Sequence, residues 1–79
     1  MEYCEVWSIP PDRLAAFFRQ HALEDADGFL WEGCRIVLTA LPPRPMGPWP
    51  MPQTRVEISG PNAENIYRQF FQTFISAGG

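Results

Sequence analysis

The residues that could do chemistry in this chain are few and lie far apart. Cys4 and Cys34 are the two cysteines, and His21 is the single histidine among 79 residues. Zinc and redox sites need cysteines or histidines at short fixed spacings, and these residues match neither pattern. Because no secretion signal precedes them, we expect two buried thiols and no disulfide. His21 falls on the apolar side of a predicted helix, which is typical of a packed structural residue.

A short acidic stretch has some of the residues of a calcium-binding loop. Asp25 and Asp27 precede Gly28, as acidic residues precede the central glycine of such loops. The alignment then puts Leu23 at the first ligand position and Cys34 where a bidentate glutamate is required. The stretch therefore predicts a solvated turn. We expect no metal site, no cofactor and no catalytic residue, so a non-enzymatic role is favoured.

The charge pattern excludes several classes of protein. Nine acidic residues outnumber six basic ones, all of them arginine, for a net charge of −3. An acidic chain without a basic run lacks the electrostatic signature of nucleic-acid binding. No apolar run approaches the roughly 20 residues needed to span a bilayer, and the first residues do not resemble a signal peptide. We therefore expect no nucleic-acid or membrane partner and a cytoplasmic location.

The apolar residues predict three strands and two helices. Strands are indicated by alternating apolar and polar residues, and helices by apolar residues three and four apart. A proline opens each predicted helix, where its missing N–H is not needed. Six of the nine prolines fall in one segment, which predicts a proline-rich hairpin loop because proline cannot donate to a strand ladder. The predicted strands are 2–9, 29–40 and 53–59, the helices are 11–23 and 61–76, and the proline-rich loop is 41–52.

This order of elements predicts one α+β domain over residues 1–79. The expected fold is βαββα, a ferredoxin-like split βαβ unit that lacks its fourth strand. Its three-stranded antiparallel sheet would have the order 1-3-2, with both helices on one face. The first strand would then be an unpaired edge, and the other face of the sheet would be uncovered. An unpaired edge invites pairing with another chain.

The leading functional hypothesis is a protein-interaction module, associating with itself as a homodimer or with another protein. Aromatic residues and arginine are enriched at interaction surfaces. We expect such residues on the open sheet face, with one tryptophan in the proline-rich loop, although an ordinary solvated face remains the alternative. The predicted interaction residues are Tyr3, Trp7, Arg35, Val37, Trp49 and Arg55.

Two other functions stay open. The first is a small-molecule or anion site, or a cofactor-free enzyme, between the sheet face and the proline-rich loop, where Arg35 or Arg55 would bind the anion. The second rests on Gly78-Gly79, an ending that resembles the ubiquitin-like sulfur carriers. The resemblance implies a flexible tail that enters an adenylating enzyme. That family opens with a hairpin, whereas this chain is predicted to open with strand and helix, and Gly78 as a left-handed helix cap explains the same residues.

Overall fold

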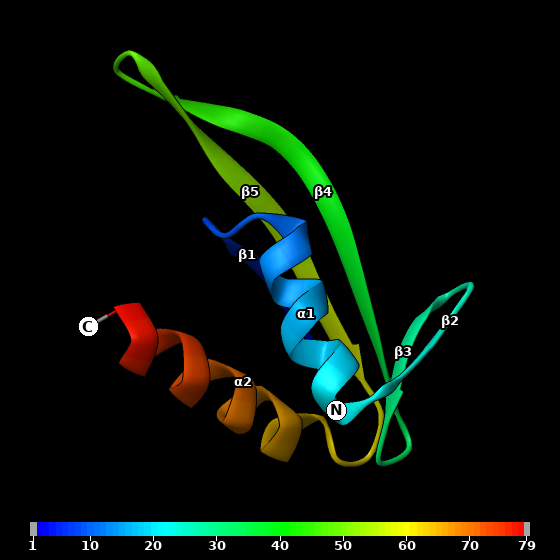
Figure 1. Cartoon of the computed structure of the whole chain (residues 1–79). Helices are drawn as coiled ribbons and strands as arrows, with labels where there is room; N and C mark the ends of the chain where they lie inside the picture. The colour runs from blue at the N-terminus through cyan, green and yellow to red at the C-terminus, as the bar shows by residue number, and fades with distance from the viewer. Residues whose placement is uncertain (1, 79) are drawn as a thin grey trace.

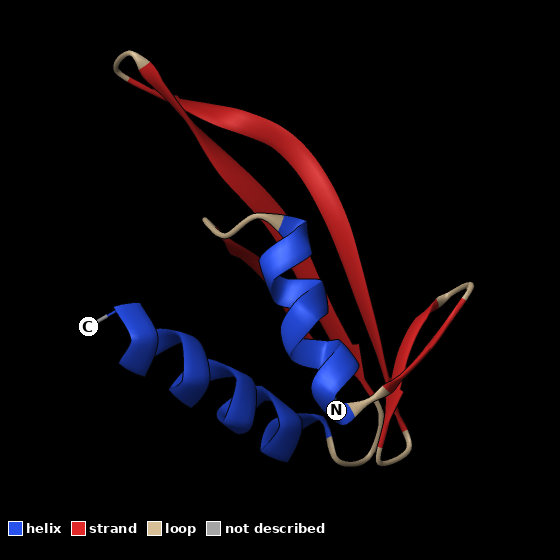
Figure 2. Ribbon diagram, in the orientation of Figure 1, coloured by secondary structure: helices blue, strands red, loops and turns tan. Residues whose placement is uncertain are grey.

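The computed structural model describes residues 2–78 and shows a small α+β fold (Figure 1). Within this range two helices and five strands follow one another in the order βαββββα (Figure 2). They are β1 (Glu2–Trp7), α1 (Pro11–His21), β2 (Leu23–Asp25), β3 (Gly28–Trp31), β4 (Cys34–Met46), β5 (Trp49–Ser59) and α2 (Ala63–Gly78).

The five strands form one antiparallel sheet in the order β1-β5-β4-β3-β2. The two edges of the sheet are therefore β1 and the short β2. Both helices cover the same face: α1 packs on β3 and β4, and lies in front of the β4–β5 pair in Figure 1, while α2 packs on β1 and β5. The opposite face, which we call the open face, has no helix over it.

The prediction of a three-stranded βαββα sheet was wrong. The segment expected as one strand over 29–40 is divided at Glu32 and Gly33, whose φ angles are 48° and 81°. Two successive positive φ angles are typical of the tight turn of a β-hairpin, so this stretch becomes the β3–β4 hairpin. Residues 23–25, expected to end a helix and begin a turn, form β2. The ferredoxin-like description has no support in a sheet of this order.

The predicted proline-rich loop was also wrong, because β4 and β5 remain paired through most of it. Their register continues to Met46↔Trp49 and includes one shift between Leu41 and Arg44. Gly47, with φ 58°, is the first central residue of the two-residue turn, as in a type II′ hairpin. We call residues 41–53 the arm. Figure 1 shows it extending well beyond both helices.

The register explains how the arm accommodates proline. Pro45 lies directly opposite Pro50. Antiparallel strands alternate between pairs that exchange N–H···O bonds and pairs that do not, so two facing prolines must be a non-hydrogen-bonded pair. Their nitrogens point outward, where no ladder bond is lost. On the same alternation Pro52 also points its nitrogen outward.

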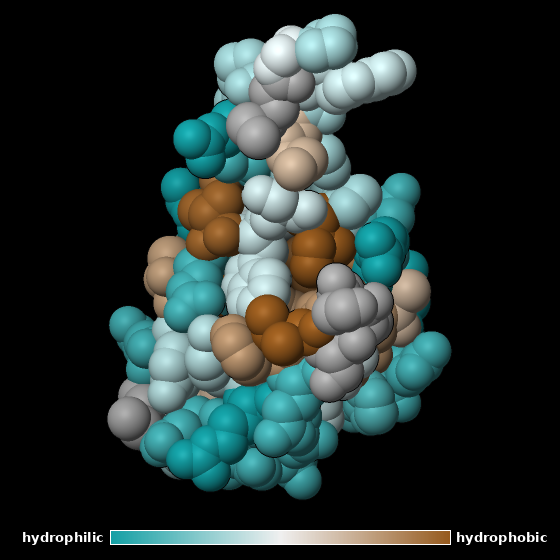
Figure 3. Space-filling model, turned by 90° about the vertical axis from the view of Figure 1, so that its left-hand side faces the viewer, coloured by the Kyte–Doolittle hydropathy of each residue, from teal (hydrophilic) through white to brown (hydrophobic). Residues whose placement is uncertain are grey.

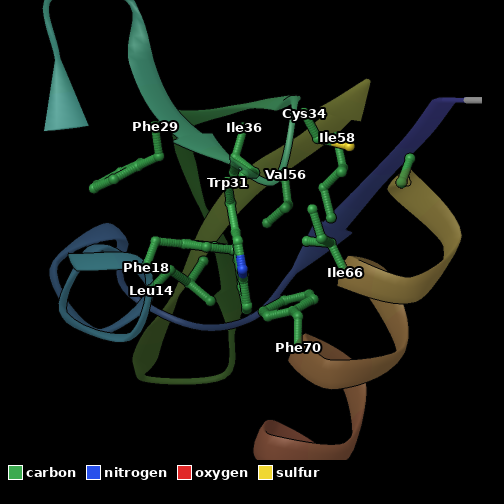
Figure 4. Close-up of a cluster of buried hydrophobic side chains, with 11 residues drawn as sticks. Leu14, Phe18, Phe29, Trp31, Cys34, Ile36, Val56, Ile58, Ile66 and Phe70 are labelled. Atoms are coloured by element: carbon green, nitrogen blue, oxygen red, sulfur yellow. The ribbon is translucent and has the colours of Figure 1, made fainter. Parts of the chain in front are cut away.

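The core lies between the helices and one face of the sheet. Figure 4 shows Leu14 and Phe18 of α1, and Ile66 and Phe70 of α2, pointing toward the side chains of β3, β4 and β5. The sheet contributes apolar residues at alternate positions, as expected for a strand covered on one face. The buried sheet residues are Phe29, Trp31, Cys34, Ile36, Thr54, Val56 and Ile58.

Both helices are close to their predicted positions, with shifted ends. Helix α1 starts at Pro11 as expected and ends at His21. Helix α2 starts at Ala63, because the carbonyl of Asn62 accepts the first helical bond from Ile66, at 3.2 Å. Within residues 2–78, no helix is long and apolar enough to cross a membrane.

Candidate interaction edge

The β1 edge carries the longest row of open backbone groups in the described sheet. In β5 the backbone N–H and C=O groups of successive residues point alternately toward β4 and toward β1. Because Pro50 points its backbone groups away from β4, Thr54, Val56 and Ile58 point theirs toward β1. They pair with Trp7, Glu5 and Tyr3. The remaining residues of β1 must therefore turn their N–H and C=O groups outward. These residues, which we call the β1 edge, are Glu2, Cys4 and Val6.

The other free edges of residues 2–78 are shorter. Strand β2 has three residues, and its pairing with β3 leaves only Glu24 turned outward. Strand β4 is no longer paired with β3 after Ile36. The backbone groups of Leu38 and Ala40 therefore point outward, before the prolines begin. Pro50 and Pro52 provide no N–H on the outer edge of the arm. Only β1 therefore offers three alternating donors and acceptors without a proline.

The structure places Tyr3 and Trp7 on the helix-covered side of β1 and not on the open face. The Tyr3 ring stacks on Tyr67 of α2 with a centroid distance of 4.5 Å. Trp7 packs edge-on against Phe70 and Phe71 at 4.8 and 5.9 Å. The predicted face was wrong because β1 has apolar residues on both sides, so alternation alone does not choose between them.

Glu5 shares the helix-covered side and binds α2 to the edge strand. The Tyr67 hydroxyl donates to the Glu5 carboxylate, with oxygen distances of 2.9 and 3.0 Å. Burial raises the pKa of Tyr67 above its usual value, and the hydrogen bond to Glu5 acts in the same direction. Nearby, the buried indole Nε1 of Trp7 has no hydrogen-bond partner among the described residues.

The predicted residues Arg35, Val37 and Arg55 do lie on the open face. They alternate with buried neighbours and pair with Ser59, Glu57 and Thr39, respectively. Both arginines have acidic neighbours. Arg35 donates to Asp25 at 2.6 Å, and this hydrogen bond lowers the pKa of that carboxyl group. Arg55 lies 3.8 Å from Glu57.

Trp49 lies apart from these residues, near the tip of the arm, with 76% of its surface exposed. The arm projects away and does not fold over the open face. Four cavities of about 200 to 380 Å³ in the described surface are lined by neither arginine and by no arm residue. This arrangement gives no support to an anion site between the open face and the prolines.

Exposed apolar side chains flank the β1 edge on both sides. Val6 is 53% exposed on the open face, while Phe71 and Ile75 of α2 are 39% and 50% exposed. Figure 3 views the left-hand side of Figure 1 and shows hydrophobic side chains gathered below the arm. Of these, Val6 and Phe71 lie beside β1, since the Phe71 ring is 5.9 Å from that of Trp7, and we call these two the apolar flank. The flank was not predicted from the sequence, because the apolar spacing of a helix does not show how much of its apolar face the sheet leaves exposed.

The two cysteines have different environments. Cys34 is fully buried, but Cys4 is exposed on the open side of β1, so the expectation of two buried thiols was wrong for Cys4. Both are free. His21 stacks on Trp31 with a centroid distance of 5.0 Å and an interplanar angle of 9°. Within the described part of the chain, no group of histidine, cysteine and acidic residues could hold a metal.

The C-terminal glycines give the carrier hypothesis no extended tail within the described residues. Helix α2 continues through Gly78, so this residue is helical and is not a cap beyond the helix. Gly79 lies outside the described residues.

Comparison with known proteins gave no match among family models, curated proteins or solved structures.

Proposed function

We propose that this chain is a non-enzymatic self-association module that forms a homodimer through the β1 edge. One observation carries the proposal. The three outward-facing residues of β1 form an unblocked strand edge, and exposed apolar side chains flank it on both sides. Such an edge is a template for pairing with another chain, because its N–H and C=O groups have no partner within the sheet.

The composition of β1 agrees with this role. Proteins commonly protect an edge strand with lysine, proline or a bulge. Strand β1 has none of these: its register with β5 is continuous from Glu2↔Ser59 to Trp7↔Thr54. The same chain places prolines along the arm, the other place where long strand edges are open. Because prolines block strand pairing along the arm and nothing blocks it along β1, pairing with another chain is favoured at β1.

The mass of the protein in solution tests the proposal. Sedimentation equilibrium or light scattering should give twice the chain mass of 9.0 kDa at micromolar concentrations. Val6→Asp would place a new charge on the edge and should weaken dimerisation by roughly tenfold or more, equivalent to about 1.4 kcal/mol. A circular dichroism melt should confirm that the variant remains folded.

Leu23→Asp is the matched control. Leu23 is also an exposed apolar residue on an edge strand, at the other end of the sheet, with 77% exposure. This variant should dimerise like the wild type. A monomeric wild type at all concentrations, or equal dissociation of both variants, would overturn the proposal.

A further inference from the structure

We infer that two copies pair their β1 strands antiparallel about Cys4, so that Cys4 of one copy faces Cys4 of the other. This register rests on the proposed dimer and specifies its geometry. Three features of β1 favour this register: its free backbone groups, the charges along the strand and the surface beside it.

The backbone groups restrict the possible registers. Two antiparallel edges bond only where an outward-facing residue meets another outward-facing residue. Because the outward residues are Glu2, Cys4 and Val6, the symmetric registers within β1 that form more than one outward pair are centred on Tyr3, Cys4 or Glu5. Centring on Cys4 pairs all three outward residues: Cys4 with Cys4, and Glu2 with Val6 in both directions. The other two centres each leave one outward residue of every copy without a partner.

The charges disfavour one of these alternatives. Centring on Glu5 would place the two Glu5 side chains directly opposite each other, and like charges in that position destabilise a sheet. Glu5 already accepts a hydrogen bond from Tyr67, which holds its carboxylate close to the strand. Centring on Cys4 places each Glu5 opposite Tyr3 and each Glu2 opposite Val6. No acidic residue of β1 then faces another.

The surface of the open face also fits the Cys4 register. A cavity of about 310 Å³ is lined by Glu2, Cys4 and Glu57, among others. Val6 of the second copy would lie across from Glu2, at the border of this cavity, where its exposed methyl groups can leave water. The register centred on Tyr3 leaves Val6 beyond the paired region.

The resulting assembly is a continuous ten-stranded sheet. The two-fold axis would run perpendicular to the sheet through the Cys4 pair, as in any isologous antiparallel strand contact. Both helix layers would then lie on one side and both open faces on the other. Facing residues in a hydrogen-bonded pair have Cα atoms about 5.5 Å apart, within the range that a disulfide can bridge.

Thiol crosslinking tests this register. Cys34 is buried, so Cys4 is the accessible thiol of the described chain. Mild oxidation with copper phenanthroline should convert the native dimer to a covalent dimer through Cys4. The comparison variant is Cys4→Ser combined with Val6→Cys, whose thiols would lie roughly 14 Å apart, four residues along the partner strand. It should crosslink at least about tenfold more slowly.

A mixed sample provides a positive control for the flanking pairs. One chain carries Cys4→Ser with Glu2→Cys, and the other carries Cys4→Ser with Val6→Cys. These two chains should crosslink to each other faster than either crosslinks to itself. A dimer by sedimentation that crosslinks faster in the Val6→Cys variant than through native Cys4 would overturn the register but leave the proposed function intact. A monomer by sedimentation would overturn both.

Discussion

The β1 edge and the arm are the two places where this small sheet has long free strand edges, and their chemistry is opposite. Strand β1 turns three residues outward with every N–H present. In the arm, Pro45, Pro50 and Pro52 stand where outward N–H groups would otherwise be. The arm therefore offers carbonyl acceptors along its outer edge but few donors.

The packing behind the two regions differs as well. Strand β1 lies under α2, through the Tyr3–Tyr67 stack and the contacts of Trp7 with Phe70. The arm has no helix over it, and Trp49 near its tip is exposed. An isolated two-stranded hairpin is only marginally stable in water, so the arm depends on β4 and β5 being held in the core. Open N–H donors and solid packing therefore occur together at β1, whereas the arm has few open donors and no helix packed on it.

The largest expected effect comes from removing one large ring in each region. Phe70→Ala should lower the free energy of unfolding by about 3–5 kcal/mol, because it leaves a cavity beneath β1. Trp49→Ala should change it by no more than about 0.5 kcal/mol, since that side chain is mostly in water. Urea denaturation followed by circular dichroism measures both. Phe70→Leu serves if the alanine variant does not fold. Similar losses for Phe70 and Trp49 would contradict the described difference in packing.

A smaller effect should follow from giving the arm the donors it lacks. Pro50→Val with Pro52→Val restores two outward N–H groups on the outer edge of β5. The variant should form assemblies larger than the wild type, visible by light scattering, because a second edge can then pair. Each change should also cost roughly 0.4–1 kcal/mol through greater freedom of the unfolded chain.

Pro48→Ala is the control for this pair, because Pro48 lies in the turn and not on the strand edge. It should leave the mass in solution unchanged. If the double variant also keeps the wild-type mass, proline is not what protects the arm.

The smallest effect concerns the bond between α2 and β1. Tyr67→Phe removes the hydrogen bond to Glu5 and should lower the free energy of unfolding by about 1 kcal/mol. The raised pKa of Tyr67 also gives a pH dependence. Its contribution is complete below the usual tyrosine pKa near 10, and it declines as the pH rises through the higher folded value. Melting curves between about pH 8 and 11, a range around the usual tyrosine pKa near 10, should therefore fall more steeply for the wild type than for Tyr67→Phe. Parallel curves would contradict the assignment.

Sequence reasoning located the helices better than the sheet. The apolar spacing of Leu14 and Phe18 identified the buried face of α1, and the alternation of Val56 and Ile58 identified a half-buried strand. These patterns are local, and a helix or strand face can be read from them. Which side of β1 is buried depends on the rest of the fold and not on the local pattern, because both sides carry apolar residues. Tyr3 and Trp7 lie on one side, and Cys4 and Val6 on the other.

The prediction of the sheet failed for two physical reasons. Glu32 adopts a positive φ, which is uncommon outside glycine, so a two-residue turn at Glu32 and Gly33 was not expected. The rule that proline breaks strands was applied without knowing which way each nitrogen points. Once Pro45 faces Pro50, the missing donors cost the pair nothing. No single sequence reveals that register in advance.

The pairing of β1 with β5 has a consequence for how the chain folds. Glu2 pairs with Ser59, so the first strand finds its partner only after most of the chain exists. Contacts between distant segments slow folding, because the loop between them must close first. During synthesis, a completed β1 remains exposed on both edges until residues 54–59 emerge. In that interval a neighbouring nascent chain could capture either edge, so β5 must arrive in time to limit the pairing of β1 to one side.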